Sequence, residues 1–164
     1  MSEPSVSTKI LIDLRAQRMR IVDLFGRGRD FPVSTALNGP GERRGSGCTP
    51  RGLHRVRLKI GANCQRGAVF IGRRWTGEIY SDALAQRWPG RDWILTRILW
   101  LTGLEFGRNR GGQVDTLRRF IYIHGCPACE PLGQPRSHGC IRMHDADLIE
   151  VFDLTPLRAL VEIV

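Results

Sequence analysis

The segment from His54 to Ile60 alternates histidine and apolar side chains with arginine and lysine. Because successive side chains in a β-strand point to opposite faces, a period of two is typical of a strand with one buried face and one face in water. This segment therefore predicts a β-sheet that covers a core on one side only.

Short apolar runs bounded by turn residues predict most of the other strands. The predicted strands span 10–14, 19–24, 31–35, 68–71, 94–101, 118–123 and 157–164, and the first two form a hairpin. The run 94–101 also fits a helix. Helical spacing predicts two short helices at 81–88 and 145–153, and Asp145 is the expected N-cap of the second. The pattern predicts a mainly β fold with one or two short helices.

Length and composition set the size and class of the protein. A chain of 164 residues matches one domain, and 41% hydrophobic with 25% charged residues is typical of soluble globular proteins. We expect a short N-terminal extension over residues 1–8 and a single domain over residues 9–164. The longest apolar stretch, 94–101, is interrupted by Thr96 and Arg97 and is too short to cross a membrane.

The chain is strongly basic, with a formal net charge of +9 and an isoelectric point near 10.3. Almost all of this charge is arginine, since Lys9 and Lys59 are the only lysines. The arginines are spread along the whole length, and neither a basic helix nor an aromatic-basic motif groups them as a nucleic-acid-binding surface would. We expect a solvated basic surface that attracts acidic ligands, with no nucleic-acid or membrane partner.

A cysteine lies in an unusually polar turn near the C-terminus. Residues 137–143 read Ser-His-Gly-Cys-Ile-Arg-Met, which is too polar and glycine-broken for ordinary core. His124 directly follows the apolar run 120–123, and the end of a strand holds a side chain firmly. An imidazole held there can be aimed at a thiol on the next turn. Cys140 and His124 therefore have the layout of a nucleophile and its base.

The same residues resemble a family signature. Ile123-His124-Gly125, a variable loop and then Ser137 to Arg142 closely resemble the active-site signature of the L,D-transpeptidase catalytic domain (YkuD-type). Further segments resemble other blocks of that family in the same order, namely residues 10–18, 31–35 and the Thr-Pro-x-Gly turn at 49–52. The resemblance implies a YkuD-type β-sandwich and peptidoglycan acyl transfer by a cysteine nucleophile.

The expected chemistry centres on the thiol. A thiol attacks as the thiolate, and an ordinary thiol with a pKa of about 8.5 is mostly protonated at neutral pH. Cys140 therefore needs the imidazole of His124 to take its proton. By resemblance, His124 is oriented by the carbonyl of Gly125 or the hydroxyl of Ser137. The amides of Gly139 and Cys140 are the expected oxyanion donors, because glycine lets the chain turn tightly enough to aim two N–H groups at one oxygen.

Three more residues near the signature are candidates for binding substrate. Arg142 either holds a substrate carboxylate or pairs within the protein, His138 braces the loop, and Tyr122 forms core or cleft wall. If His124 is not the base, that role passes to His138. Family members often carry threonine where this chain has Cys126, which removes any contact made by that hydroxyl and leaves the Cys–His pair intact.

The resemblance implies a defined reaction. Cys140 attacks the carbonyl of the third residue of a peptidoglycan tetrapeptide stem, expels the terminal D-alanine and remains as a thioester. If water accepts the acyl group, the enzyme is an L,D-carboxypeptidase. If an amine accepts it, the enzyme is an L,D-transpeptidase that cross-links stems or exchanges D-amino acids. The N-terminus shows neither the basic nor the apolar region of a secretory signal. We therefore expect a cytoplasmic enzyme that trims stems or muropeptides by hydrolysis, and a periplasmic one if the chain is trimmed.

The other four of the five cysteines are Cys48, Cys64, Cys126 and Cys129. Without an export signal we expect reduced thiols. The Cys-x-x-Cys motif at 126–129 is interpreted as two incidental loop thiols, with a redox-sensitive pair or half of a metal site as alternatives. No cofactor and no metal are expected. A pseudoenzyme that only binds stem peptides and a redox-sensing protein are the alternative function classes.

Overall fold

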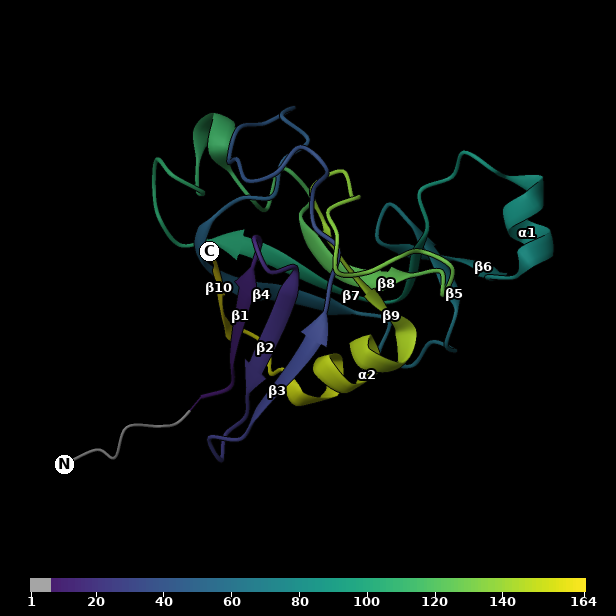
Figure 1. The fold of residues 1–164 in the computed structure, drawn as a ribbon, viewed down its shortest axis with the longest axis horizontal. Helices are drawn as coiled ribbons and strands as arrows, with labels where there is room; N and C mark the ends of the chain where they lie inside the picture. Colours follow the sequence, from purple (N-terminus) through teal and green to yellow (C-terminus); the bar gives the residue numbers. More distant parts are fainter. Residues whose placement is uncertain (1–6) are drawn as a thin grey trace.

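The computed structural model describes residues 7–164, in which a strongly bent sheet wraps a core (Figure 1). The predicted extension over 1–8 therefore lies outside the described residues except for its last two. Within residues 7–164 the strands are β1 (Lys9–Asp13), β2 (Arg18–Val22), β3 (Gly28–Pro32), β4 (Gly52–Ile60), β5 (Ala68–Ile71), β6 (Arg74–Ile79), β7 (Ile94–Gly103), β8 (Tyr122–Cys126), β9 (Ile141–His144) and β10 (Leu160–Ile163). The helices are α1 (Asp82–Arg87), α2 (Asp145–Leu154) and a short 3-10 turn, η1 (Gly112–Val114). This mainly β fold with two α-helices confirms the predicted class. Neither α-helix in the described range is long and apolar enough to cross a membrane.

The strands follow one path in the order β3-β2-β1-β10-β4-β7-β5-β6, and β8 branches from β7 to pair with β9. Most pairs are antiparallel, but β1 pairs with β10 in parallel, as β8 does with β9. The last strand, β10, thus lies between the first strand and β4. Both ends of the described chain are tied into the same sheet.

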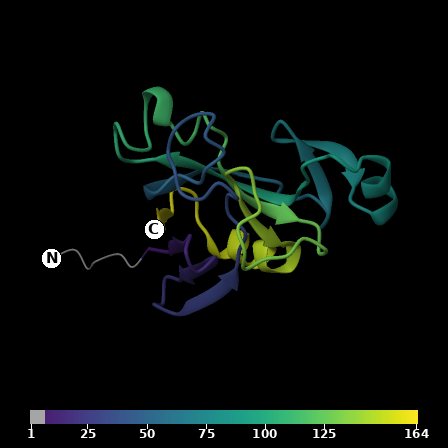
Figure 2. The ribbon, with the colours of Figure 1, turned by 45° about the horizontal axis from the view of Figure 1, so that its top comes forward.

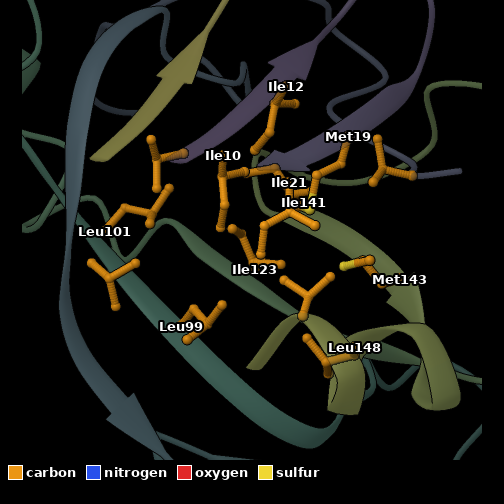
Figure 3. Packing of buried hydrophobic residues seen from close by; sticks show 14 of the residues in the cluster. Ile10, Ile12, Met19, Ile21, Leu99, Leu101, Ile123, Ile141, Met143 and Leu148 are labelled. Atoms are coloured by element: carbon orange, nitrogen blue, oxygen red, sulfur yellow. The ribbon is translucent and has the colours of Figure 1, made fainter. Parts of the chain in front are cut away.

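The main core lies where the β1–β2 hairpin faces the β8–β9 pair (Figure 3). Ile10 and Ile21 from the hairpin are buried against Ile123 and Ile141. Helix α2 packs on β7, β8 and β9, and its Leu148 closes one side of this cluster. The core therefore fixes β8 and β9, the two strands that carry the signature residues.

The alternation predicted for 54–60 holds only in the first half of β4. His54 and Val56 are fully buried, whereas Leu58 is 42% exposed and Ile60 is partly buried. The pairing of β4 with β7 shifts register between Val56 and Leu58. Because an extra residue at a β-bulge changes the face of the side chains that follow, the end of β4 leaves the main core.

Several predicted strand boundaries are wrong. The strand predicted at 118–123 is β8, which starts at Tyr122, because a turn precedes it in which the Arg118 N–H donates to Asp115 Oδ1 over 3.0 Å. Strand β3 covers 28–32 rather than 31–35. The ambiguous run at 94–101 is a strand, β7, and it extends to Gly103. Strands β6 and β9 are missing from the prediction.

The two helices begin differently. Ser81 caps α1, and its Oγ accepts a hydrogen bond from the Leu84 N–H over 3.1 Å. The predicted N-cap of α2, Asp145, is instead its first helical residue, and His144 occupies the cap position without a side-chain bond. Strand β9 runs in extended conformation up to His144, and the chain turns helical at Asp145, one residue earlier than an N-cap at Asp145 would give. Helix α2 therefore follows β9 without a loop.

Candidate active site

The parallel pairing of β8 with β9 brings the two signature segments together. In this register Ile123 lies opposite Ile141, and His124 lies opposite Arg142. Cys140 is the residue before β9, so its thiol emerges at the edge of the pair next to Tyr122, the first residue of β8. Residues about twenty positions apart in the chain thus share one side of the sheet.

Two backbone groups hold the sulfur of Cys140. The Tyr122 N–H donates to Sγ over 3.3 Å, and the thiol donates to the Phe120 carbonyl, also over 3.3 Å. Burial raises the pKa of Cys140 to about 12, although the Tyr122 N–H opposes that effect. The resting thiol is therefore protonated at neutral pH.

His124 is fixed in one orientation inside the sheet. Its side chain is 1% exposed, and Nδ1 lies 2.8 Å from the Gly125 carbonyl oxygen. Burial lowers the pKa of His124, which favours the neutral ring. A neutral ring that donates from Nδ1 to a carbonyl has its lone pair on Nε2, so His124 is ready to accept a proton there.

A set of hydrogen bonds locks the turn before Cys140. The Ser137 hydroxyl donates to the Cys140 carbonyl over 2.5 Å and accepts from the Gly139 N–H over 3.2 Å. The buried Thr49 hydroxyl donates to the Gly139 carbonyl over 2.8 Å. Gly139 has φ of +134°, and a Cβ there would lie 3.2 Å from the Cys48 carbonyl oxygen. Both the backbone angle and the close approach therefore favour glycine at this position.

This geometry bears on one expected residue, Gly139, and adds two contacts that sequence reasoning missed. The Gly139 N–H was expected to bind the oxyanion, but in the resting turn it donates to Ser137 Oγ. The Tyr122 N–H, 3.3 Å from Sγ, is a donor beside the reacting atom that sequence reasoning missed. Thr49 was also missed as a site residue, although its Thr-Pro-x-Gly turn was noticed as a family block. Only the fold shows that this turn reaches Gly139.

Arg142 pairs within the protein. Its Nη2 donates to Asp92 Oδ1 over 3.1 Å, its Nη1 lies 3.8 Å from Glu130, and its side chain is 11% exposed. The same Asp92 carboxylate lies 3.7 Å from His138 Nδ1, whose side chain is well exposed. Of the two roles predicted for Arg142, the structure shows the internal one. Asp92 and Glu130 carry no local sequence signal that would have pointed to them.

Tyr122 belongs to an aromatic stack beside the thiol. Arg73, in the turn between β5 and β6, donates to Tyr122 Oη over 3.1 Å and lies 4.7 Å from the centre of the Phe120 ring and 5.0 Å from that of Trp100. The Trp100 and Tyr122 rings meet edge to face. Tyr122 therefore lines the site from a packed position, and the turn that carries Arg73 lies over it.

The remaining cysteines lie in separate environments. All five cysteines fall within residues 7–164 and are free thiols. Cys126 is buried and donates to the Met143 carbonyl over 3.3 Å, and burial raises its pKa to about 12. Cys129 is exposed. In the part of the chain that the structure describes, no group of three or more metal-binding side chains is found.

One hollow adjoins the site, and a second hollow adjoins the first. The first, called the inner cleft, has a volume of about 150 Å³ and is lined by Asp92, Glu130, His138 and Arg142 together with residues 89–91, Trp93, Cys126 and Pro127. The second, called the arm groove, has a volume of about 560 Å³ and is lined by Ile71, Glu78, Trp88 and residues 89–91. Both hollows share the wall formed by residues 89–91.

Comparison with solved structures shows the same fold in several L,D-transpeptidases. One from Mycobacterium smegmatis is 17% identical with a TM-score of 0.59, and the match covers 96% of this chain and 58% of that protein. One from Xylanimonas cellulosilytica is 20% identical with a TM-score of 0.54, covering 99% and 63%. A variant from Enterococcus faecium is 16% identical with a TM-score of 0.57, covering 96% and 49%. The chain thus spans less than two thirds of the length of these proteins.

The sequence itself matches a family model. None of the curated proteins matches the chain. The model of the L,D-transpeptidase catalytic domain (YkuD) matches residues 7–163, which is nearly the whole chain. The signature residues, the mainly β fold and this match agree. The chain therefore belongs to the L,D-transpeptidase catalytic domain (YkuD) family.

Proposed function

We propose that the protein is a cysteine acyl-transferase acting on peptidoglycan tetrapeptide stems, with Cys140 as nucleophile and His124 as base. One observation carries this proposal: a buried imidazole, held at Nδ1 by the Gly125 carbonyl, lies on the strand paired with the one that Cys140 precedes. Family membership supports peptidoglycan stems as the substrate class.

The first half of the reaction produces a thioester. Because burial raises the pKa of Cys140, the thiol is protonated and its S–H donates to the Phe120 carbonyl at rest. As the sulfur attacks, the S–H bond breaks and the proton passes from Sγ to His124 Nε2. A bond forms between Sγ and the carbonyl carbon of the third stem residue, and the carbonyl oxygen becomes an oxyanion beside the Tyr122 N–H. The C–N bond to D-alanine then breaks, and the leaving amine takes the proton from His124. D-alanine leaves and the acyl group stays on sulfur.

We propose water as the acyl acceptor. Water gives a proton to His124 and its oxygen to the acyl carbon, which releases the tripeptide stem and restores the thiol. The inner cleft supports this choice, because a volume of about 150 Å³ beside His138 and Arg142 leaves little room for a second stem. The L,D-transpeptidases among the similar structures favour transfer to an amine as the second candidate. The cytoplasmic location stays a prediction, which cell fractionation tests.

Product analysis tests both the acyl transfer by Cys140 and the choice of water as acceptor. The purified protein is incubated with monomeric disaccharide-tetrapeptide, and the products are resolved by mass. Tripeptide product with free D-alanine supports hydrolysis. Cross-linked dimers, or exchange of added D-amino acids without trimming, refute water as the acceptor but still support acyl transfer by the enzyme. Cys140→Ala should abolish every product, and the exposed Cys129→Ser serves as the matched thiol control with activity retained. Full activity of Cys140→Ala would refute the mechanism.

A further inference from the structure

The arm groove exposes apolar surface on a part of the molecule that projects from the core. Strands β5 and β6 with helix α1, called the arm, extend to one side of the sheet in both ribbon views (Figures 1 and 2). In the groove Ile71 is 58% exposed and Trp88 is 49% exposed. Exposed apolar hollows of this kind mark ligand-binding grooves more often than plain surface.

The groove also carries one fixed pair of planar polar groups. Arg91 Nη2 donates to Glu78 Oε1 over 2.8 Å, and Arg91 Nη1 lies 3.3 Å from Glu78 Oε2. The Arg91 guanidinium is held further by the Trp93 ring, 4.8 Å away. Both side chains line the groove, whose surface is otherwise mostly apolar, and the Glu78 side chain stays one third exposed. The hollow thus offers one indole, one aliphatic side chain and one oriented ion pair.

Two chain segments connect this groove to the thiol. At one end, Ile71 lies two residues before Arg73, whose guanidinium contacts Tyr122 and Phe120, the residues that hold the Cys140 sulfur. At the other end, Arg91 precedes Asp92, which contacts Arg142 and His138 beside Cys140. The groove therefore reaches the site through the wall at residues 89–91, which it shares with the inner cleft lined by His138 and Arg142.

We propose that the arm groove binds the N-acetylated disaccharide of a muropeptide substrate. A pyranose ring has an apolar C–H face that packs on an indole and a rim of hydroxyl and amide groups that bond to planar polar side chains. The stem peptide carries several charges, which a mostly apolar groove would desolvate without pairing. About two stem residues separate the sugar from the third residue, a reach of roughly 10 Å that suits adjoining hollows. This inference rests on the proposed function.

Substrate comparison tests the inference. The wild-type protein should process disaccharide-tetrapeptide with kcat/KM about tenfold or more above that for free tetrapeptide, because one well-packed aromatic contact is worth roughly that factor. Trp88→Ala should bring this ratio close to one. Phe25→Ala is the matched control, because Phe25 is an exposed aromatic on the β2–β3 turn at the other end of the sheet and should keep the wild-type ratio.

A binding measurement separates this inference from the proposed function. Cys140→Ala protein is titrated with the peptide-free disaccharide, and the indole N–H signals are followed by NMR. We expect the Trp88 signal to shift, even if the enzyme proves to use another acceptor or another bond. A wild-type ratio near one, a ratio unchanged by Trp88→Ala, or an unmoved Trp88 signal would each overturn the sugar site.

Discussion

Burial acts on Cys140 and His124 in opposite directions on the pKa scale. It raises the pKa of the thiol to about 12 and lowers that of the imidazole, and both changes favour the neutral form. An ion pair of thiolate and imidazolium is therefore disfavoured in the resting protein. In the proposed mechanism the proton therefore moves only when substrate arrives, and His124 acts as a general base rather than as the permanent partner of a thiolate.

The reactivity of Cys140 should follow from this neutral state. Alkylation of Cys140 by iodoacetamide should be slow at neutral pH and rise steadily toward pH 10, because the thiolate fraction grows throughout that range. Mass mapping of the modified peptide at each pH gives the rate for Cys140 alone. The exposed Cys129 provides the comparison within the same chain. A fast rate for Cys140 that is flat from pH 6 upward would show a preformed thiolate instead.

Replacement of each signature histidine should distinguish the general base from the residue that only supports the loop. His124→Ala should lower kcat/KM by about two to four orders of magnitude, the usual contribution of a general base. His138→Ala should cost much less, because His138 is mostly exposed and reaches the site through Asp92. Steady-state rates on disaccharide-tetrapeptide measure both. A loss below tenfold for His124→Ala would assign the base to His138.

Thr49 supports the nucleophile turn through one hydroxyl. Its Oγ1 accepts from the Ala36 N–H over 3.0 Å and donates to the Gly139 carbonyl, and all three residues are buried. Thr49→Val removes both bonds at nearly constant shape, and should lower the free energy of unfolding by about 2–4 kcal/mol. Thr49→Ser keeps the hydroxyl and should stay near wild type. Urea unfolding measures both variants, and equal stability of the two would contradict this role.

Sequence patterns point to the candidate nucleophile and base but not to the residues that support them. Cys140 and His124 stand in short local signatures, so spacing alone marks them. Thr49, Asp92 and Arg73 act through contacts that span many residues, and nothing in their own segments indicates those contacts. Only the strand order brings them to the site, and a single sequence does not contain that order.

Strands were predicted correctly where residues that favour β-strands are also buried in the fold. Strands β1, β2 and β5 are short apolar runs between turns, and their predicted positions agree with the structure to within two residues. Strand β6 was missed because its side chains are exposed or only partly buried and show no alternation. Strand β9 was missed because its four residues follow the glycine turn that drew attention as a loop. Pairing with a neighbouring strand, β5 for β6 and β8 for β9, makes these two segments strands.

The whole protein should lose stability when its buried histidines must take up protons. Burial lowers the pKa of His54 to about 4, and its ring bonds to the Gly52 carbonyl and the Thr116 hydroxyl. The unfolded chain binds this proton near pH 6.5, so the stability from a neutral His54 is complete above pH 6.5 and is lost as pH falls toward 4. Burial lowers the pKa of His124 as well and acts in the same direction.

Urea unfolding between pH 7 and pH 4 tests this dependence. The wild-type protein should lose roughly 3 kcal/mol through His54 over this range. His54→Gln keeps hydrogen-bonding atoms but cannot ionise, so its stability should fall less steeply with decreasing pH. Because all other groups are the same in both proteins, the difference between the two curves isolates His54. Parallel curves would show that His54 is not held neutral.

The pairing of β10 between β1 and β4 makes the stability of the whole sheet depend on the last strand. In β10 Val161 is fully buried and lies opposite Ile10 and His54, whereas Glu162 is partly exposed and pairs with Lys9 over 3.0 Å. Val161→Asp places an unpaired charge in the core, which costs more than about 4 kcal/mol against a typical total of about 5–15 kcal/mol.

We therefore expect Val161→Asp to be unfolded or strongly destabilised as a unit, and Glu162→Gln to lie within about 1 kcal/mol of wild type, because an exposed ion pair contributes little. Circular dichroism during heating measures both variants, and hydrogen exchange shows where the loss falls. If β10 closes the sheet, protection should drop in β1–β3 and in β7–β9 together. Loss confined to β1–β3, with β7–β9 still protected, would show that the hairpin is a separate unit and that β10 does not couple the ends of the chain.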